Sequence, residues 1–345
     1  MTLHLDERVL TGVLVLTMVM SMTMISSSAV GTGTTYEYYI QGNPDDVNYG
    51  GTSPGLLLAG GSTDVAEAME WMISKSGGGD FLVIRCSGTD AYNPWIYKTL
   101  GGVDSCETII FLKDEACFDE FVLDKIRCAE ALFIAGGNQW DYVRMWKGTP
   151  VEDAIHDVLS KGAPIGGTSA GLAVLGEFVF SAQRNTIDSD EALRNPYHPR
   201  LTLEQDFLVM PNMGDTITDS HFVARDRMGR LVAFMARTMQ DGWTTQAHGI
   251  GIDEKVALAV DECGSVKLFD ACNDGTGAAY FLMSTVSPAV CEPRTPLTFE
   301  GISVFKMTIA STFSLATWTG SGGEQYELSA VDGTLVSTQA GGAVY

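Results

Sequence analysis

The sequence predicts an α/β fold in which a mostly parallel sheet is covered by helices on both faces. Two observations support this prediction. In the first half of the chain, short apolar segments alternate with longer segments of helical character. The apolar segments lack the alternation of apolar and polar residues that marks a half-exposed strand, so they are typical of strands buried on both faces. From residue 249 the pattern changes to short strands separated by Gly and Asp turns, which predicts a β-rich end.

The predicted elements of the first half alternate between strand and helix. Residues 35–42 alternate enough to form a strand, and residues 56–61 form a buried strand that ends in two glycines. Asp64 is suited to cap a helix over residues 65–75. The chain continues with strands over 81–86, 107–112 and 131–135, a helix over 118–128, and helical structure up to residue 159.

The β-rich end completes the predicted architecture. Short strands are expected over 249–260, 265–269 and 278–284, with similar patterns over 299–318 and 326–336. Residues 292–296 (EPRTP) are suited to a joint before a small appendage. We therefore expect a leader over 1–30, a main α/β domain over 31–292 and a β-rich extension over 293–345.

The most informative segment is residues 161–176, KGAPIGGTSAGLAVLG. It predicts a helix end, a short buried strand, a sharp turn around Ser169 and a second helix. G-x-S-x-G in this context is typical of a nucleophile elbow, in which the hydroxyl points away from the sheet and the neighbouring residues must be small. The amide of Ala170 would then lie at a helix N-terminus, where it can stabilise an oxyanion. The alternative is a glycine-rich turn with a buried serine.

Three predicted strands end in paired glycines, at residues 60–61, 136–137 and 166–167. Because functional sites of open α/β sheets lie at the carboxyl ends of the strands, we expect these three pairs to meet at one edge. The alternative is that the glycines only allow the chain to turn.

A serine nucleophile needs a base, and the sequence holds five histidines. His221 is the best candidate, since His4 lies in the predicted leader, and it belongs to a segment over residues 219–230 with three arginines. The alternative is a structural histidine next to a solvated or salt-bridged helix start. His156 falls on a predicted helix, whereas His198 and His248 lie in predicted loops and are weaker candidates. A polar segment over 181–200 has the length of a site-forming loop.

The overall charge restricts the partners. The chain of 345 residues has 21 basic and 43 acidic residues, a net charge of −22. This charge disfavours binding to nucleic acid and to anionic membranes, and it is compatible with a cationic substrate. No Cys-x-x-Cys or Cys/His cluster indicates a metal, and we expect no cofactor.

The first residues predict secretion. Residues 13–24 are an uncharged, mostly apolar run as long as the core of a signal peptide, and small residues follow, although Asp6 and Glu7 replace the expected basic flank. The run is too short for a membrane span, and an uncleaved anchor is the alternative. In a secreted protein some of the seven cysteines would pair, and the odd number leaves at least one unpaired.

Three segments together resemble the cyanophycinase family of serine peptidases, relatives of the α-aspartyl dipeptidases. They are GGTSAG at residues 166–171, GGNQ at 136–139 and D-x-HF-x-x-R-x-R-x-GR at 219–230. The resemblance covers roughly residues 55–260, and it implies a class I glutamine-amidotransferase-like, flavodoxin-like fold. It also implies hydrolysis of cyanophycin or of related aspartyl or isoaspartyl peptides, and a possible homodimer.

The resemblance also implies residue roles. Ser169 would be the nucleophile, His221 the general base, and a carboxylate after the elbow would orient His221, with Glu191 ahead of Asp190 and Asp188. The amides of Gly137 and Ala170 would form the oxyanion hole. The positions that bind substrate or shape its pocket would be Gln139, Asp219, Ser220, Arg225, Arg227 and Arg230. Ser220 is a departure, because known cyanophycinases carry glutamine there, and this leaves specificity for cyanophycin open.

Other protein classes are also compatible with these residues. An α/β-hydrolase esterase has the same order of serine, acid and histidine, but His221 follows Ser169 by only 52 positions, which leaves little room for the further strands and helices of that fold. An aspartyl dipeptidase-like enzyme of other specificity and a catalytically silent binding protein on the same fold are further alternatives.

Overall fold

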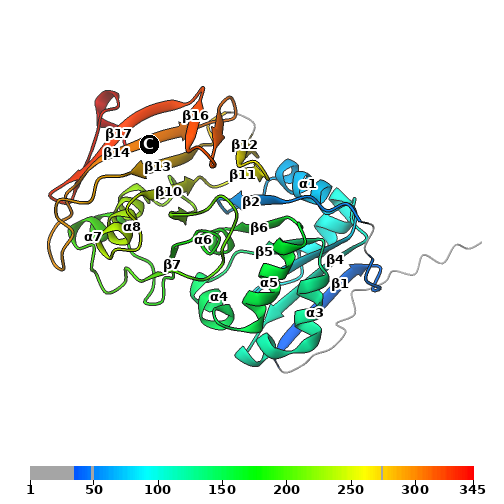
Figure 1. The fold of residues 1–345 in the computed structure, drawn as a ribbon. Helices are drawn as coiled ribbons and strands as arrows, with labels where there is room; N and C mark the ends of the chain where they lie inside the picture. Colours follow the sequence, from blue (N-terminus) through cyan, green and yellow to red (C-terminus); the bar gives the residue numbers. More distant parts are fainter. Residues whose placement is uncertain (1–34, 48–49, 273–274) are drawn as a thin grey trace, which may run out of the picture.

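The computed structural model describes residues 35–47, 50–272 and 275–345. The predicted signal segment, residues 1–30, lies outside the described residues. Two large sheets dominate the molecule, one of ten and one of six strands, and a two-stranded sheet pairs β7 (Val179–Phe180) with β8 (Leu203–Glu204). Figure 1 shows the six-stranded sheet lying beside the α/β part of the chain.

The ten-stranded sheet contains the predicted parallel strands. Its order is β1-β4-β3-β5-β6-β2-β11-β12-β15-β16, and β4, β3, β5, β6 and β2 run parallel, with β1 antiparallel at the edge. The bounds are β1 (Tyr36–Gly42), β2 (Gly55–Ala59), β3 (Asp80–Arg85), β4 (Ser105–Phe111), β5 (Ala131–Ile134), β6 (Ile165–Thr168), β11 (Val256–Asp261), β12 (Ser265–Asp270), β15 (Thr312–Ser314) and β16 (Thr319–Ser321).

Helices cover both faces of this sheet, as the sequence predicts. On β2, Leu56 and Leu58 join the apolar core under α3 (Glu120–Cys128), α4 (Gln139–Trp146) and α5 (Pro150–Ser160). Leu57 and Ala59 join the separate core under α1 (Ala66–Lys75). Successive side chains of a strand point to opposite faces, so a strand between two helical layers must be apolar throughout. The predicted α/β fold is therefore confirmed.

The six-stranded sheet has the order β18-β17-β14-β13-β10-β9, in which only β9 and β10 are parallel. Its bounds are β9 (Thr216–Asp219), β10 (Ala247–Ile252), β13 (Ala279–Ser284), β14 (Phe299–Met307), β17 (Glu324–Val331) and β18 (Thr334–Ser337). One face packs against α8 (Met228–Gln240), whose residues are nearly all buried. This packing fixes the segment that precedes α8, which carries His221.

The β-rich end is built into both sheets. β14, β17 and β18 extend the six-stranded sheet, whereas β15 and β16 extend the ten-stranded sheet beyond β12. The predicted division of the chain at residues 292 and 293 stays a prediction, since these pairings distribute the extension over two sheets.

The remaining elements are short. They are α2 (Tyr92–Pro94), a π-helix (Trp95–Leu100), a 3₁₀ helix (Asp114–Phe118), α6 (Ala170–Ala173), α7 (Ser189–Arg194) and a 3₁₀ turn (Ala340–Gly342). The helix predicted after the Ser169 turn is thus a single turn, and the polar segment 181–200 contains a helix.

The structure corrects two local predictions. Asp64 does not cap α1, because its carboxylate accepts a hydrogen bond from the Tyr92 hydroxyl instead. The expected pairing of cysteines is wrong for this structure, in which all seven are free thiols.

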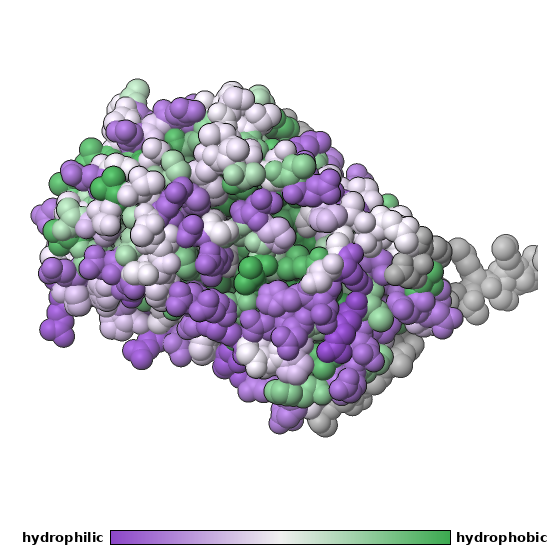
Figure 2. Space-filling view, in the orientation of Figure 1, coloured by the Kyte–Doolittle hydropathy of each residue, from purple (hydrophilic) through white to green (hydrophobic). Residues whose placement is uncertain are grey.

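Figure 2 shows the hydropathy of one face of the molecule. Hydrophilic residues are spread over this face, and hydrophobic residues gather in a hollow near its middle. Among the described residues, no helix is both long enough and apolar enough to span a bilayer.

Candidate active site

Ser169 occupies a strained turn between β6 and α6. Its backbone angles are φ 53° and ψ −112°, a conformation that side-chain-bearing residues rarely adopt and that is typical of strained functional turns. The glycines around it are required by close backbone approach. A Cβ on Gly171 would lie 2.0 Å from the Ile134 carbonyl oxygen, and one on Gly167 would lie 2.5 Å from the Gly171 carbonyl oxygen. The predicted elbow is thus present.

Two of the predicted glycine pairs meet at this turn. A Cβ on Gly61 would lie 2.6 Å from His221 Nε2 and 3.1 Å from Ser169 Cβ, and one on Gly136 would lie 3.5 Å from Ser169 Cβ. β5, β6 and β2 are neighbours in the sheet, so their carboxyl ends form one edge. The glycines therefore leave the space in which serine and histidine side chains can meet.

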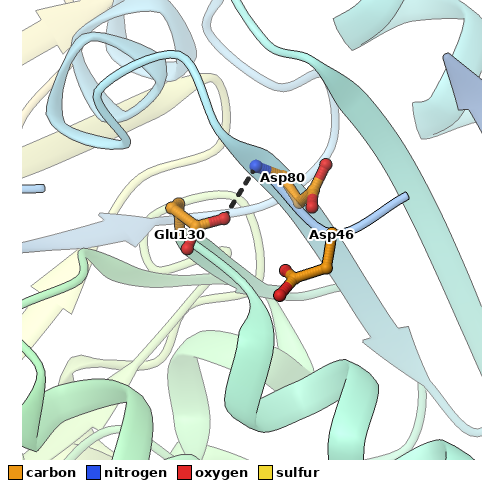
Figure 3. A group of neighbouring side chains, drawn as sticks. All are labelled: Asp46, Asp80 and Glu130. Carbon is orange, nitrogen blue, oxygen red and sulfur yellow. Dashed lines mark hydrogen bonds between the residues drawn. The ribbon is translucent and has the colours of Figure 1, made fainter. Parts of the chain in front are cut away.

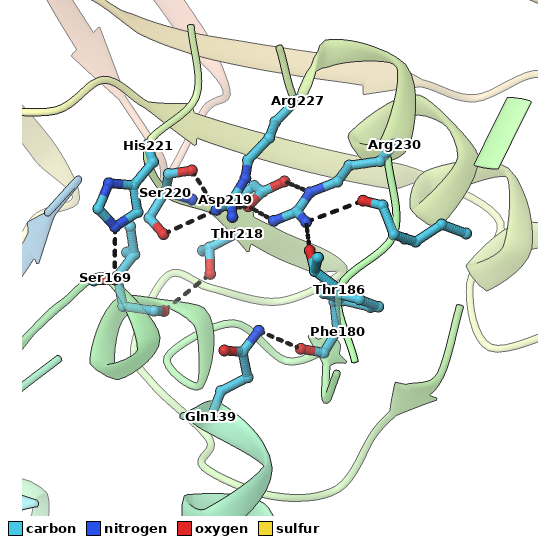
Figure 4. Close-up of polar contacts among 12 residues, drawn as sticks. Gln139, Ser169, Phe180, Thr186, Thr218, Asp219, Ser220, His221, Arg227 and Arg230 are labelled. Atoms are coloured by element: carbon cyan, nitrogen blue, oxygen red, sulfur yellow. Dashed lines mark hydrogen bonds and ion pairs between the residues drawn. The ribbon is translucent and has the colours of Figure 1, made fainter. Parts of the chain in front are cut away.

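The structure brings Ser169 and His221 into direct contact. Ser169 Oγ lies 2.8 Å from His221 Nε2, as Figure 4 shows. His221 Nδ1 lies 2.6 Å from Glu254 Oε1, in the turn between β10 and β11. A carboxylate can only accept, so Nδ1–H donates to Glu254 and Nε2 is left to accept the Ser169 proton. This arrangement has the roles of a Ser-His-acid triad.

The environment keeps the imidazole available as a base. Burial lowers the pKa of His221 below its ordinary value of 6.5, the hydrogen bond to Glu254 opposes this shift, and the charges of Arg225 and Arg227 add to it. The hydrogen bond to His221 lowers the pKa of Glu254. Near neutral pH the pair is therefore a neutral imidazole next to a carboxylate, which is the state a general base requires.

The predicted orienting carboxylate is wrong. Glu191 does not reach His221, because its side chain closes the N-terminus of α7 as a capping box with Asp188 and also forms an ion pair with Arg200. Asp190 is exposed on the same short helix. All three candidates in the segment after the elbow are therefore held away from the imidazole, and Glu254 takes the place assigned to them.

Strand order explains the position of Glu254. β9 and β10 are parallel neighbours, and Asp219 at the end of β9 pairs with Gly251 near the end of β10. His221 and Glu254 each follow the end of one of these strands by two residues. The signal available in the sequence was an acidic residue directly after a glycine-rich strand, at residues 253–254.

A pocket of about 390 Å³ opens in front of Ser169 and His221. Apart from Glu191, every residue predicted for the site lines it: Gly137, Gln139, Ser169, Ala170, Asp219, Ser220, His221, Arg225, Arg227 and Arg230. Asn138, Gln183, Asn185 and Thr186 add uncharged polar groups. The pocket thus combines a serine–histidine pair with three guanidinium groups.

The arginines differ in their surroundings. Arg230 is 3% exposed and holds Asp219 with two bonds of 2.6 Å, while its guanidinium lies over the rings of Phe180 and Phe234. Arg227 donates to the Ser220 carbonyl oxygen (2.7 Å) and to Asp219 Oδ1 (3.2 Å). Arg230 and Asp219 therefore form a buried wall of the pocket (Figure 4).

Arg225 differs from both. Its side chain is exposed, and it forms no ion pair with any residue that the structure describes. Its charge lowers the pKa of both His221 and Glu254, so the guanidinium lies near this pair. Among the three arginines, Arg225 is the one whose hydrogen-bond donors are free to meet a substrate carboxylate.

Ser220 lies at the floor of the pocket. It is 4% exposed, and its amide donates to Asp219 Oδ1 (3.0 Å). Arg227 Nη1 approaches its hydroxyl at 3.4 Å. The short side chain at this position lets the Arg227 guanidinium lie against the backbone of β9.

The other histidines in the described chain serve local contacts. His156 accepts from the Val209 amide, His198 accepts from the Arg200 amide, and His248 stacks on Trp318. A larger hollow, about 500 Å³, lies among Phe281, Phe305 and Trp318 in the β-rich part. It has no serine–histidine pair, so the smaller pocket is the candidate active site.

Three carboxylates cluster at the opposite end of the parallel strands (Figure 3). They are Asp46, Asp80 and Glu130, with oxygens within 4.8 Å of one another. Glu130 accepts from the Asp80 amide at 3.0 Å and lies 3.8 Å from Lys161 Nζ, and Asp80 accepts from Ser105. Protein groups thus contact the two buried carboxylates, Asp80 and Glu130, and the cluster lies at the end of the strands opposite to Ser169.

With the site described, the comparisons identify the family. A family model described as peptidase family S51 matches residues 90–266, just over half of the 345 residues, so the chain belongs to peptidase family S51. The matched range contains the Ser169 elbow, His221 and Glu254. The cyanophycinase-like resemblance drawn from residues 136–139, 166–171 and 219–230 is confirmed.

Relatives named cyanophycinase share part of their length with this chain. The protein from Trichormus variabilis is 24% identical over 223 residues, which are 62% of this chain and 66% of the relative. That from Synechococcus elongatus is 28% identical over 178 residues, 50% of this chain and 49% of the relative. The chain thus spans less than two thirds of the length of these relatives.

A solved structure supports the fold alone. It is the crystal structure of a peptidase from an acI-B1 Actinobacterium, with a TM-score of 0.50 and 17% identity, and it covers 77% of this chain and 98% of that chain.

Proposed function

We propose that this chain is a serine-type peptidase of the cyanophycinase-like class. The observation that carries the proposal is the continuous series of contacts from Ser169 Oγ to His221 Nε2 and from His221 Nδ1 to Glu254, at the edge of a pocket. Membership of peptidase family S51 supports the same reaction class.

The proposed reaction is an acyl transfer. Ser169 Oγ attacks the scissile carbonyl carbon while its proton passes to His221 Nε2, and Glu254 stabilises the imidazolium that forms. His221 then gives the proton to the departing amine as the C–N bond breaks, which leaves an ester on Ser169. Water attacks this ester with His221 as the base, and it releases the carboxylic acid product and free Ser169.

Two backbone amides are suited to stabilise the oxyanion. Gly137 and Ala170 both line the pocket beside Ser169, and α6 begins at Ala170. Preorganised amides of this kind lower the barrier by about 3–4 kcal/mol per donor in enzymes where one has been removed. We assign them this role because both belong to the pocket that contains Ser169, and because Ala170 directly follows Ser169 at the start of α6.

The charge of the pocket favours an acidic substrate. Arg225 presents free donors beside the catalytic pair, and Arg227 adds a second guanidinium. A guanidinium binds a carboxylate with two parallel hydrogen bonds, so a peptide with a free carboxylate near its scissile bond fits. We propose cyanophycin or another aspartyl or isoaspartyl peptide, cleaved at the chain end, which would release β-Asp-Arg from cyanophycin.

Product analysis tests this proposal. The purified protein is incubated with cyanophycin and, separately, with α- and β-aspartyl dipeptides, and the products are identified by mass spectrometry. We expect release of β-Asp-Arg or cleavage of isoaspartyl bonds, and loss of all turnover in Ser169→Ala at unchanged melting temperature. Turnover by Ser169→Ala at the wild-type rate would refute the nucleophile, and hydrolysis of simple esters alone would refute the peptidase assignment.

Export and self-association are further proposals. The apolar run over residues 13–24 supports export, although seven free thiols are more typical of a reducing compartment. N-terminal sequencing of the protein from its host tests export. Cleavage of the predicted leader, residues 1–30, would give a chain that begins near residue 31. A homodimer is supported by the family likeness alone, and sedimentation analysis would show twice the mass of 37.0 kDa.

A further inference from the structure

Tyr345, the last residue of the sequence, lies against the segment that carries His221. We name residues 221–228 the His221 loop, and it also holds Arg225 and Arg227. The Tyr345 hydroxyl donates to Asp226 Oδ1 at 2.8 Å and accepts from the Met228 amide at 3.0 Å. Its ring meets Phe222 edge-on, with centroids 5.9 Å apart. One side chain thus contacts the loop near its beginning and at its end.

The contact to Met228 satisfies a group that the loop itself leaves open. Met228 is the first residue of α8, and the amides of a first helical turn have no partner within the helix. Arg227, at the N-cap position, provides no capping side chain. The Tyr345 oxygen supplies the missing acceptor from 117 residues away.

The loop needs such contacts because its backbone is strained. His221 has φ 49° and Asp226 has φ 48°, both in the left-handed region that costs non-glycine residues free energy. The Val223 amide donates to Asp253 Oδ1 at 3.1 Å, which fixes the beginning of the loop. Tyr345 contacts the end of the His221 loop, next to Arg225 and Arg227 in the sequence.

Tyr345 is itself held firmly by the six-stranded sheet. The Tyr326 hydroxyl of β17 donates to the Val344 carbonyl oxygen at 2.9 Å, and Gln339 Nε2 donates to that of Ala343 at 3.0 Å. The Tyr345 ring also packs edge-on against Tyr280 of β13, at 5.8 Å. Figure 1 marks the end of the chain over the strands of this sheet.

We propose that Tyr345 is a positioning residue for the active site, which holds the His221 loop so that Arg225 and Arg227 face the substrate pocket. The β-rich extension lies outside residues 90–266, the part that matches the family, and through Tyr345 it acts on the catalytic loop. The inference rests on the proposed peptidase function for its kinetic consequence, but its structural part can be tested without activity.

The substitution Tyr345→Phe isolates the hydroxyl. It removes both hydrogen bonds and keeps the ring that packs on Phe222 and Tyr280, so the fold should persist. Tyr280→Phe is the matched control, because Tyr280 belongs to the same ring cluster and its hydroxyl makes no hydrogen bond within the described residues. Hydrogen exchange of the His221 loop and steady-state kinetics on an isoaspartyl dipeptide are measured for wild type and both variants.

We expect faster exchange of the amides of residues 225–228 in Tyr345→Phe, with unchanged exchange in β2, β5 and β6. We also expect KM to rise roughly fivefold to tenfold with a smaller change in kcat, because loss of one or two hydrogen bonds releases the guanidinium groups rather than the serine. Tyr280→Phe should behave as wild type in both measurements.

Three results separate the possible explanations. Unchanged loop exchange in Tyr345→Phe would overturn the inference, whatever the kinetics show. A lower melting temperature with unchanged KM and unchanged loop exchange would mean that Tyr345 only stabilises the fold, and it would overturn the positioning role too. If wild type cleaves none of the peptides, the proposed function fails, while faster loop exchange in Tyr345→Phe would still support the contact as the element that fixes the loop.

Discussion

The site contains two carboxylates, each bonded to a basic side chain, and their surroundings differ. The Glu254 carboxylate is partly open to solvent, since its side chain is 31% exposed, whereas the His221 side chain bonded to it is 8% exposed. The pair of Asp219 and Arg230 is closed, with side chains 4% and 3% exposed. In the proposed reaction the first pair takes up and releases a proton, whereas the second keeps its charges and holds the pocket wall. The exposure of the carboxylate thus separates the pair that we propose to react from the pair that supports the pocket wall.

The sharpest test of this comparison is the loss of the open carboxylate. Glu254→Gln keeps the shape but cannot stabilise the imidazolium, so kcat should fall about 10²–10⁴-fold, as expected when the acid of a triad is lost. Because Glu254 is partly exposed, the melting temperature should change little. If Glu254→Gln instead loses stability while its folded fraction keeps the wild-type kcat, Glu254 supports the fold and is not the acid of the triad.

Loss of the buried carboxylate, Asp219, should mainly reduce stability rather than kcat. Asp219→Asn leaves the Arg230 guanidinium buried without its charged partner, and breaking a buried pair in this way costs about 3–5 kcal/mol. Urea unfolding should therefore show a strongly reduced free energy of unfolding. Equal stability of Asp219→Asn and wild type would show that Arg230 finds another partner or that the wall is open to water.

The pH dependence of kcat/KM should follow the titration of His221 next to Glu254. The reaction needs neutral His221, whose pKa is lowered by burial, so activity should be full at pH 7 and should fall as the pH drops through a value below 6.5. Glu254 opposes that shift and Arg225 adds to it, so Glu254→Gln should move the acid limb to lower pH and Arg225→Ala to higher pH. Identical limbs in all three proteins would exclude His221 as the titrating group.

The smallest effect on activity is expected for Arg225, the exposed arginine of the pocket. Arg225→Ala removes an exposed guanidinium, so KM for an acidic dipeptide should rise several-fold while the melting temperature stays the same. An amidated peptide without the carboxylate is the control substrate, and its KM should not change. An equal rise in KM for both peptides would mean that Arg225 does not bind the substrate carboxylate.

Local motifs made the serine and the histidine predictable. Ser169 lies in a G-x-S-x-G turn after an apolar strand, and His221 lies in a segment rich in arginine, so each was found from its immediate neighbours. The apolar strands of the parallel sheet were found for the same reason. Their burial on both faces leaves a pattern that does not depend on tertiary contacts.

The acid was missed because its position depends on strand order. Glu254 reaches His221 only because β10 pairs in parallel with β9, a pairing between segments separated by α8. The sequence did contain a warning against Glu191, since Asp188 and Glu191 have the spacing of a capping box, which predicts a helix start rather than a catalytic acid. The burial of Arg230 was equally hidden, because it depends on a contact with Asp219 across the pocket wall.

The most direct test of the central claim is the rate at which a fluorophosphonate modifies Ser169, measured by mass spectrometry at pH 7. The account predicts rapid modification of wild type, much slower modification of Glu254→Gln, and a wild-type rate for Glu191→Gln, which alters the α7 cap and the ion pair with Arg200 but no contact of His221. A wild-type rate in Glu254→Gln together with slow modification of Glu191→Gln would contradict it.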